Sequence, residues 1–274
     1  IVRRRDPPLH EFLESPRALD VEIAKLEAAG GDKALIAEKR MLMEQIDGMS
    51  EANPMLGLRG CRLGIVYPIL PVMQVRAIAT ACAELQKEGL NPKPEIMIPL
   101  VSVVAELEKL RKVAEDTIAE VAAEQGVELD IPVGTMIELP RAAVTADEIG
   151  AVADFFSFGT NDLTQTTFGF SRDDVEAEFV PQYLAERLLP YNPFATIDPG
   201  VAKLVEMGVE LGHKGNPDLV CGVCGEHGGD PDSVKMFHTI GLDYVSCSPY
   251  RVPLARLAAG QAALAEKMGD GRDK

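Results

Sequence analysis

The chain has 274 residues, of which 46% are hydrophobic and 26% are charged, a composition typical of a folded globular protein. Its 43 acidic and 27 basic residues give a formal net charge of -16. This balance argues against a nucleic-acid or anionic-membrane partner, because both need a basic surface. If the substrate is an anion, local arginines or a metal ion must bind it.

The first residues and the cysteines bear on the origin of the chain and on its cellular compartment. It begins at Ile1 without an initiator Met, so we expect it to be a piece of a longer polypeptide. No run of about 18 apolar residues is present, and the sequence predicts no transmembrane helix. Five cysteines scattered over a large chain indicate free thiols in a reducing compartment. We expect a cytoplasmic location, with a plastid or glycosome as the organellar alternatives.

Short apolar runs alternate with longer helical patterns, as expected of repeated βα units. The expected strands are a stub at Val2-Arg3, then Met55–Leu58, Glu95–Pro99, Gly134–Leu139, Phe155–Gly159, Leu219–Cys224 and Tyr244–Cys247. The expected helices are Pro68–Lys87, Ser102–Glu124, 198–211, Pro231–Ile240 and Arg251–Met268. Over roughly 250 residues this order predicts an α/β fold of the (β/α)8, TIM-type barrel class. A doubly wound sheet is the alternative, weakened by the missing glycine pattern at the first βα turn.

Two segments interrupt the alternation. Residues 14–52 are helical and charged, and they predict a helical insertion or hairpin on the rim of the barrel. Residues 169–197 contain prolines and aromatic residues without a regular pattern, and they have the length of a functional loop or lid.

Polar residues follow or close several of the predicted strands. They are Arg59, Glu138, Asn161, Asp162 and Cys224. The carboxyl ends of parallel strands form the face on which barrel active sites are built. We therefore expect these side chains to meet on one rim and to carry the chemistry.

Glu138 and Asp162 suit a hard divalent cation such as Mg2+, which takes oxygen ligands and leaves positions for water and substrate. The alternative is that both are carboxylates placed at helix N-termini. The Cys221-Gly-Val-Cys224 pair allows a zinc or redox interpretation, but no second pair of ligands has the usual spacing. A single Cys224 thiol facing a pocket fits better, since an ordinary thiol pKa of about 8.5 suits proton donation at neutral pH.

Five strings along the chain carry a resemblance. They are Asp6–Phe12 (DPPLHEF), Gly57–Gly64 (GLRGCRLG), Met136–Ala143 (MIELPRAA), Phe158–Gln165 (FGTNDLTQ) and Cys224–Pro231 (CGEHGGDP). Together they resemble the C-terminal barrel of the pyruvate, phosphate dikinase family, which binds phosphoenolpyruvate and pyruvate, over essentially the whole chain. The Asn-Asp and Cys-Gly-Glu strings are shared with phosphoenolpyruvate synthase and with enzyme I of the sugar phosphotransferase system.

The resemblance implies a Mg2+ site at which arginines bind phosphate or carboxylate groups and a thiol protonates an enolate at its methylene carbon. The implied metal ligands are Glu138 and Asp162, and the implied acid/base is Cys224. The implied substrate-binding residues are Arg3, Arg59, Glu138, Gly159, Thr160, Asn161, Asp162, Arg172 and Met136.

In this family a phosphohistidine domain carries the phosphoryl group between an ATP-grasp domain and the barrel, and neither domain is expected in this chain. We expect one barrel domain over residues 1–274, with the first strand of the barrel lacking, and a homodimer. The full reaction, in which ATP, pyruvate and phosphate give AMP, phosphoenolpyruvate and diphosphate, is not expected of the chain alone. The alternatives are a barrel of the phosphoenolpyruvate synthase type and a non-catalytic fragment that serves as a dimerisation module.

Overall fold

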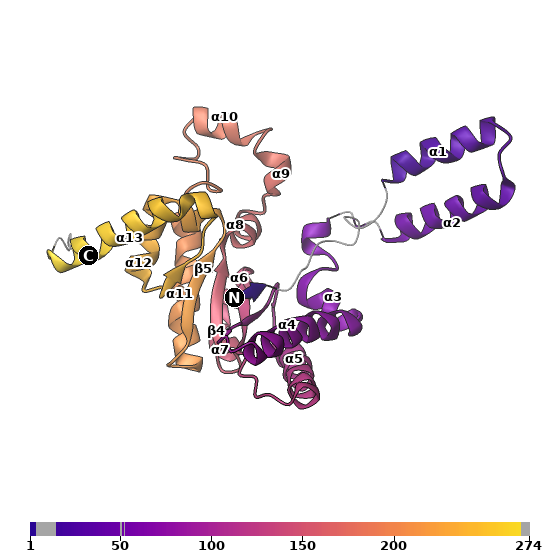
Figure 1. Cartoon of the computed structure of the whole chain (residues 1–274). Helices are drawn as coiled ribbons and strands as arrows, with labels where there is room; N and C mark the ends of the chain where they lie inside the picture. The colour runs from indigo at the N-terminus through magenta and orange to yellow at the C-terminus, as the bar shows by residue number, and fades with distance from the viewer. Residues whose placement is uncertain (4–14, 50, 52, 270–274) are drawn as a thin grey trace.

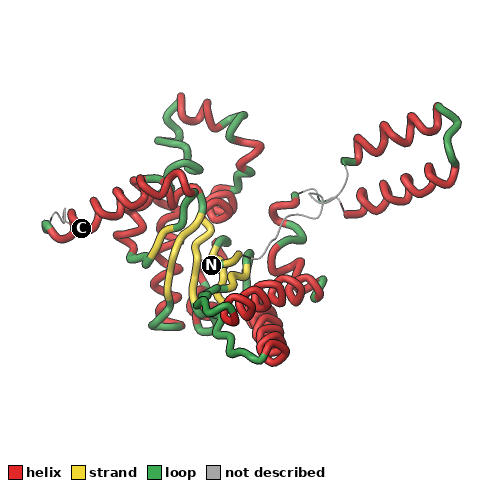
Figure 2. The backbone as a smooth tube through the Cα atoms, in the orientation of Figure 1, coloured by secondary structure: helices red, strands yellow, loops and turns green. Residues whose placement is uncertain are grey.

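The computed structural model describes residues 1–3, 15–49, 51 and 53–269, so the DPPLHEF string and the last five residues lie outside the described part. Its centre is a six-stranded parallel sheet in the order β1-β2-β3-β4-β5-β6, curved into a half-barrel (Figures 1 and 2). The strands are β1 (Val2–Arg3), β2 (Ile96–Ile98), β3 (Val133–Ile137), β4 (Phe155–Gly159), β5 (Val220–Cys224) and β6 (Tyr244–Val245). The predicted α/β class with parallel strands is confirmed.

Helices connect successive strands and cover one face of the sheet. In chain order they are α3 (Gly60–Val66), α4 (Ile69–Lys87), α5 (Val104–Gln125), α6 (Pro140–Val144), α7 (Ala146–Gly150), α8 (Thr160–Phe168), α11 (Pro199–Gly215), α12 (Pro231–Ile240) and α13 (Val252–Lys267). Three short 3-10 turns complete this part: η2 (Pro54–Leu56), η3 (Glu226–Gly229) and η4 (Pro249–Arg251). Within the described residues, no single helix is long and apolar enough to span a membrane; only α3 and α4 taken together reach that length and composition, across a bend of 109°.

The strand predicted at Met55–Leu58 is wrong, because these residues begin in the 3-10 turn η2. The Leu56 amide donates to the Asn53 carbonyl at 3.1 Å, so the backbone is hydrogen-bonded within the turn rather than to a neighbouring strand. Pro54, which fixes φ and has no N–H to donate to a sheet, favours this outcome. Arg59 therefore precedes α3 and does not close a strand.

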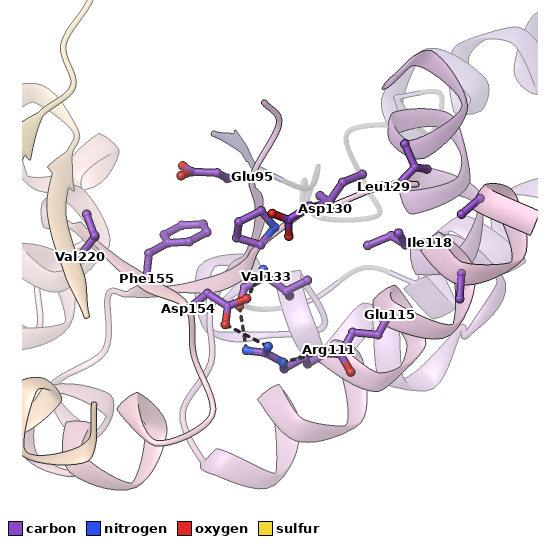
Figure 3. Close-up of a pocket in the computed structure, with 14 residues that line it drawn as sticks. Glu95, Arg111, Glu115, Ile118, Leu129, Asp130, Val133, Asp154, Phe155 and Val220 are labelled. Atoms are coloured by element: carbon purple, nitrogen blue, oxygen red, sulfur yellow. Dashed lines mark hydrogen bonds and ion pairs between the residues drawn. The ribbon is translucent and has the colours of Figure 1, made fainter. Parts of the chain in front are cut away.

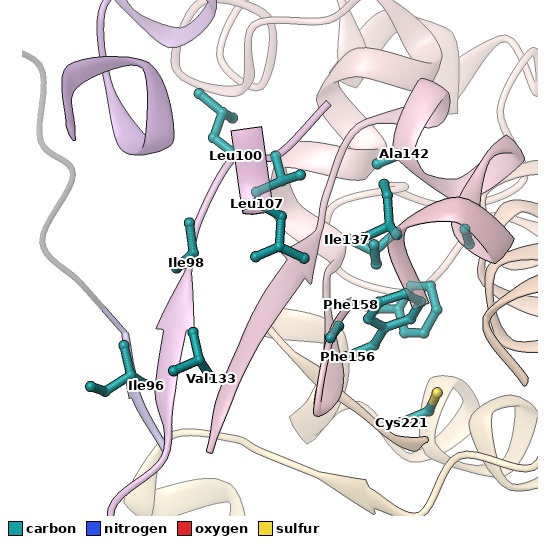
Figure 4. Close-up of a cluster of buried hydrophobic side chains, with 14 of the residues drawn as sticks. Ile96, Ile98, Leu100, Leu107, Val133, Ile137, Ala142, Phe156, Phe158 and Cys221 are labelled. Atoms are coloured by element: carbon teal, nitrogen blue, oxygen red, sulfur yellow. The ribbon is translucent and has the colours of Figure 1, made fainter. Parts of the chain in front are cut away.

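Alternate residues of each strand point to opposite faces of the sheet, as strand geometry requires. One set, which includes Ile98, Val133, Ile137, Phe156 and Phe158, packs under the helices in the main core (Figure 4). The other set faces the inner side of the half-barrel, where Met97, Met136 and Phe155 form a second buried cluster with Cys224 against it. The inner face is therefore the side on which a polar site can open to solvent.

The segment predicted to be helical forms a helical pair in its described part, α1 (Pro16–Ala28) and α2 (Lys33–Met49). Figure 1 shows the pair extending away from the sheet. It has an apolar core of its own, in which Leu19, Ile23 and Ile46 are buried.

Residues 170–198, which we call the cover segment, contain two short helices, α9 (Arg172–Val175) and α10 (Val180–Ala185). Val175, Val180 and Phe194 form a buried cluster inside it. In Figure 1 α9 and α10 extend beyond α8, at the end of the molecule opposite α7. The stretch predicted as an irregular loop is thus a small packed unit beside the carboxyl ends of the strands.

Candidate active site

Glu138 follows β3 directly, and its side chain is only 1% exposed. Its Oε1 accepts a hydrogen bond of 2.6 Å from the Leu100 amide, and its Oε2 lies 3.8 Å from Nη2 of Arg3. The carboxylate lies against the backbone of Gly159, where an added Cβ would come within 2.8 Å of Oε2 and 2.6 Å of the Met136 sulfur. A glycine at the end of β4 is therefore what lets Glu138 lie beside the residues that follow this strand.

Arg59 and Asp162 form the second ion pair of the site. Arg59 is 6% exposed, and its Nη1 lies 3.5 Å from Oδ1 of Asp162, in the first turn of α8. The same Oδ1 lies 3.4 Å from Nε2 of Gln165. Charge-assisted hydrogen bonds are usually shorter, about 2.7–2.9 Å, so these two contacts of Asp162 are long ones.

The loops that follow β4 and β5 are locked together. The Thr160 hydroxyl donates to the Cys224 carbonyl at 3.1 Å, and Oδ1 of Asn161 accepts from the Glu226 amide at 3.1 Å. Gly225 has a φ of 108°, and a Cβ there would come within 2.8 Å of the Thr160 hydroxyl oxygen. Thr160 and Asn161 therefore hold the end of β5, and with it Cys224, against the end of β4.

Cys224 is the last residue of β5, and it pairs with Gly159 of β4 in the sheet. Burial raises the pKa of its thiol; a hydrogen bond with Ser157 and the charge of Arg3 lower that pKa, and the charges of Glu138 and Asp162 raise it, so the net shift is upward. The thiol therefore stays protonated at neutral pH, which is the state a proton donor needs. Glu138, Asp162 and Arg3 all lie close enough to act on it.

Cys221 and Cys224 point to opposite faces of β5, as their odd separation predicts. Cys221 is fully buried in the main core, and burial raises the pKa of its thiol to about 12. Among the residues that the structure describes, no three His, Cys, Asp or Glu side chains are grouped so that they could coordinate a metal ion. The zinc interpretation of this pair has no support in the geometry.

Arg172, expected among the substrate-binding residues, is engaged inside the cover segment. Its Nε lies 3.0 Å from Oε2 of Glu176, and its guanidinium carbon lies 5.8 Å from the centre of the Phe194 ring. Its backbone amide donates to Oε1 of Gln165 at 2.9 Å. Arg172 thus reaches Asp162 through Gln165. Met136 and Glu138, in contrast, lie directly against Gly159, and Arg3 pairs with Glu138.

Four residues of the site were not predicted as site residues. Ser157 makes a hydrogen bond with Cys224, and the Tyr244 ring lies against Gly222 on the inner face. Gln165 and His227 make hydrogen bonds to Asp162 and Thr160. Alternate residues of a strand share a face, so Ser157 lies on the same face as Gly159, and Gly222 on the same face as Cys224. Tyr244 pairs with Gly222, so strand pairing would have identified Tyr244 as well. Gln165 and His227 lie on a helix and a turn, where spacing gives no such signal.

A larger pocket lies at the opposite, amino ends of the strands (Figure 3). It has a volume of about 640 Å3, but its one arginine, Arg111, is fully engaged. Arg111 binds Oδ1 of Asp154 at 2.9 Å, Oε1 of Glu115 at 2.6 Å and the carbonyl of Val152 at 2.8 Å. The pocket that contains Asp162 is smaller, about 370 Å3, and Gln165 and the start of the cover segment line it.

Comparison with known proteins decides the family. A family model described as the PEP-binding domain of PEP-utilising enzymes matches residues 1–264. The chain belongs to this family. It is 54% identical over 261 residues to the chloroplastic pyruvate, phosphate dikinase of Flaveria bidentis, covering 95% of this chain and 27% of that protein. It is 49% identical over 268 residues to pyruvate, phosphate dikinase of Clostridium symbiosum, covering 97% of this chain and 30% of that one.

The chain therefore spans less than a third of the length of these curated relatives. Among solved structures, a citrate lyase from Burkholderia xenovorans LB400 overlaps with a TM-score of 0.46 at 16% identity, covering 72% of this chain and 59% of that one. A structural similarity this weak assigns neither a fold nor a function to the chain.

Proposed function

We propose that the chain carries the site at which a pyruvate, phosphate dikinase interconverts pyruvate and phosphoenolpyruvate. The observation that carries the proposal is the arrangement around Gly159, where Glu138 meets Arg3 and a protonated Cys224 thiol stands within reach of their charges. Arg59 and Asp162 form the other side of the site. Such a set offers cationic groups for an anion, oxygen ligands for a metal ion and a proton donor.

The residues fit Mg2+ as the cofactor. Glu138 and Asp162 are both carboxylates, which offer oxygen ligands to a cation, and they lie 3.8 Å from Arg3 and 3.5 Å from Arg59, respectively. Mg2+ is commonly bound through one or two carboxylates, with water and substrate oxygens completing its shell. When bound, the ion would stabilise negative charge on the substrate oxygens.

The chain's own residues then do the rest. Arg3 and Arg59 bind the carboxylate or phosphoryl oxygens of the substrate, and Met136 lines the pocket at Gly159. The Cys224 thiol gives its proton to the methylene carbon of the enolate, forming the C–H bond of pyruvate's methyl group and leaving a thiolate. In the reverse direction the thiolate takes that proton back and the enolate is ready for phosphorylation.

The remaining parts of the proposal concern the longer protein. We propose that the half-barrel is part of a (β/α)8 barrel, and that the protein works as a homodimer. The phosphoryl group would come from a phosphohistidine domain charged by an ATP-grasp domain. Relatives that are chloroplastic are among the matches, and we propose a location in the cytoplasm or a plastid.

The test is deuterium exchange at the methyl group of pyruvate in D2O, with Mg2+ present. We expect exchange with the parent chain and a loss of about 100-fold or more in Cys224→Ala, the size expected for removing a general acid/base. Cys247→Ala is the matched control, because Cys247 is also a half-buried thiol and packs on the outer cluster with Val234. Exchange by the parent that survives in Cys224→Ala would reject the role of Cys224. No exchange by the folded parent would favour a non-catalytic module.

A further inference from the structure

The cover segment is a small unit with its own internal order. Asn192 donates to Oε1 of Glu176 at 2.9 Å, and Arg172 binds Oε2 of the same residue, so one carboxylate ties the start of the segment to its end. The rings of Phe170 and Phe179 pack with their centres 5.1 Å apart. A unit that is rigid inside is positioned by the few contacts that join it to the rest of the molecule.

At its start, the cover segment is held by Gln165 of α8. The Gln165 carbonyl oxygen accepts from the Arg172 amide at 2.9 Å, and its amide nitrogen lies 3.4 Å from Oδ1 of Asp162. One side chain thus contacts the backbone of the cover and the proposed metal ligand. Gln165 and Asp162 also line the same pocket as Phe170 and Ser171.

Near its end, the cover segment is held by His227 in η3, which is fully buried. Its Nε2 lies 2.8 Å from the Pro193 carbonyl, and its Nδ1 lies 2.8 Å from the Thr160 hydroxyl. The carbonyl can only accept, so Nε2 is the donor. Burial lowers the pKa of the imidazole, which is therefore neutral at neutral pH, and Nδ1 accepts from the Thr160 hydroxyl.

The Thr160 hydroxyl has a second acceptor, the Cys224 carbonyl at 3.1 Å. A hydroxyl has one hydrogen, so His227 and the backbone of Cys224 share it. A displacement of Pro193 therefore acts on the imidazole, and through Thr160 on the residue that carries the thiol. Gln165 gives the cover a corresponding link to Asp162.

We propose that Gln165 and His227 are positioning residues that hold the two ends of the cover segment and couple its position to Asp162 and Cys224. In the part that concerns substrate binding this rests on the proposed function. Neither residue touches substrate in this account. Each acts through one hydrogen bond to the cover and one to the site.

Amide hydrogen exchange of the 274-residue chain without ligand tests the links to the cover. In Gln165→Met both hydrogen bonds are lost, and we expect exchange in residues 170–176 to rise about fivefold, the size of one lost hydrogen bond. In His227→Asn the side-chain oxygen can replace Nδ1 but does not reach Pro193, so exchange in residues 191–197 should rise. In His227→Gln the longer amide can still donate to Pro193, and protection should return.

Two residues with side chains at the surface provide matched controls. Gln182→Met and His238→Asn remove hydrogen bonds to Glu186 and Glu266, and they should leave exchange in both ranges unchanged. Unchanged exchange in Gln165→Met and His227→Asn would overturn the proposal. So would a rise of the same size in α5, because that would show a global loss of stability rather than a local release.

Titration with oxalate in the presence of Mg2+ tests the coupling to the site. Gln165→Glu keeps the acceptor for the Arg172 amide but loses the donor to Asp162, so we expect normal exchange and an oxalate affinity reduced about tenfold, since a like charge now faces Asp162. Unchanged affinity in this variant would contradict the coupling. If the parent chain itself binds no oxalate, the proposed function fails, whereas the exchange experiment still decides whether Gln165 and His227 hold the cover.

Discussion

The two ends of the half-barrel use similar residues for different purposes. At the amino ends of β3 and β4, Arg111 and Asp154 are 2.9 Å apart, and the second oxygen of Asp154 accepts from the Val133 amide at 2.7 Å. At the carboxyl ends, Arg59 and Asp162 are 3.5 Å apart. The amino-end pair is closely bonded and also binds backbone on both sides, while the carboxyl-end pair is more widely spaced. Both Arg111 and Asp154 line the larger pocket, and Asp162 lines the smaller one.

This difference shows that pocket size is a poor guide to chemistry in this molecule. The larger pocket contains an arginine that makes close bonds to two carboxylates and a carbonyl, so little of its charge is left for a ligand. The smaller pocket contains Asp162, whose partners stand beyond close bonding distance. We infer that the amino end contributes to stability and the carboxyl end to binding.

The largest expected effect is on binding, in Asp162→Asn. Removing this charge takes away one of the two proposed metal ligands, and we expect the Mg2+-dependent affinity for oxalate to fall about 100-fold or more. The midpoint of thermal unfolding should change little, because the contacts of the Asp162 carboxylate within the described part of the chain are 3.4 and 3.5 Å long. Calorimetric titration and a thermal melt measure the two quantities. A fall in unfolding temperature with unchanged affinity would place Asp162 among the structural residues.

The same substitution at the other end, Asp154→Asn, should give the opposite result. It weakens the bond to Arg111 and one of two backbone contacts, and we expect a loss of about 1.5 kcal/mol in the free energy of unfolding. Oxalate affinity should stay within about twofold of the parent, which is within the usual effect of a distant site. Urea unfolding followed by circular dichroism gives the free energy of unfolding. Loss of oxalate affinity in Asp154→Asn without loss of stability would contradict the inference that the amino end contributes to stability and the carboxyl end to binding.

A smaller effect is expected in the pH dependence of Cys224. Burial raises the thiol pKa in the folded chain, whereas the unfolded chain should titrate near the ordinary value of about 8.5. As pH rises through this window the unfolded chain ionises first, so the contribution of Cys224 to stability is present below about 8.5 and is lost above it. Alkylation by iodoacetamide, measured for the peptide containing Cys224, should reach half its maximum rate at a higher pH in the folded chain than in urea. An equal or lower midpoint would contradict the proton-donor state.

Much of the fold could be predicted from the sequence because local signals and burial agree there. The bounds of β4 and α12 match the prediction, since a short apolar run with aromatic residues and an Asp-Pro start are strong signals. The Met55–Leu58 strand failed where an equally apolar run follows Asn53-Pro54 and folds into a turn. Apolar character alone does not separate a strand from a turn.

The candidate site was predictable to the extent that it depends on strand ends. Glu138 and Asp162 could be placed together because they follow neighbouring strands, and the structure brings both within range of Cys224. The guanidinium of Arg172 could not be placed, because its partners Glu176 and Phe194 belong to a segment whose packing is set by tertiary contacts. The same holds for His227, whose two partners are 67 and 34 residues away along the chain.

The most direct test of the central claim is a calorimetric titration of the chain with oxalate, with and without Mg2+. Oxalate is a planar dianion that imitates the enolate of pyruvate, and its oxygens can bind a metal ion. We expect binding that requires Mg2+ and is lost in Glu138→Gln. Binding that is equally strong without Mg2+, or no binding by a chain shown to be folded, would contradict the claim that Glu138 and Asp162 form a metal site.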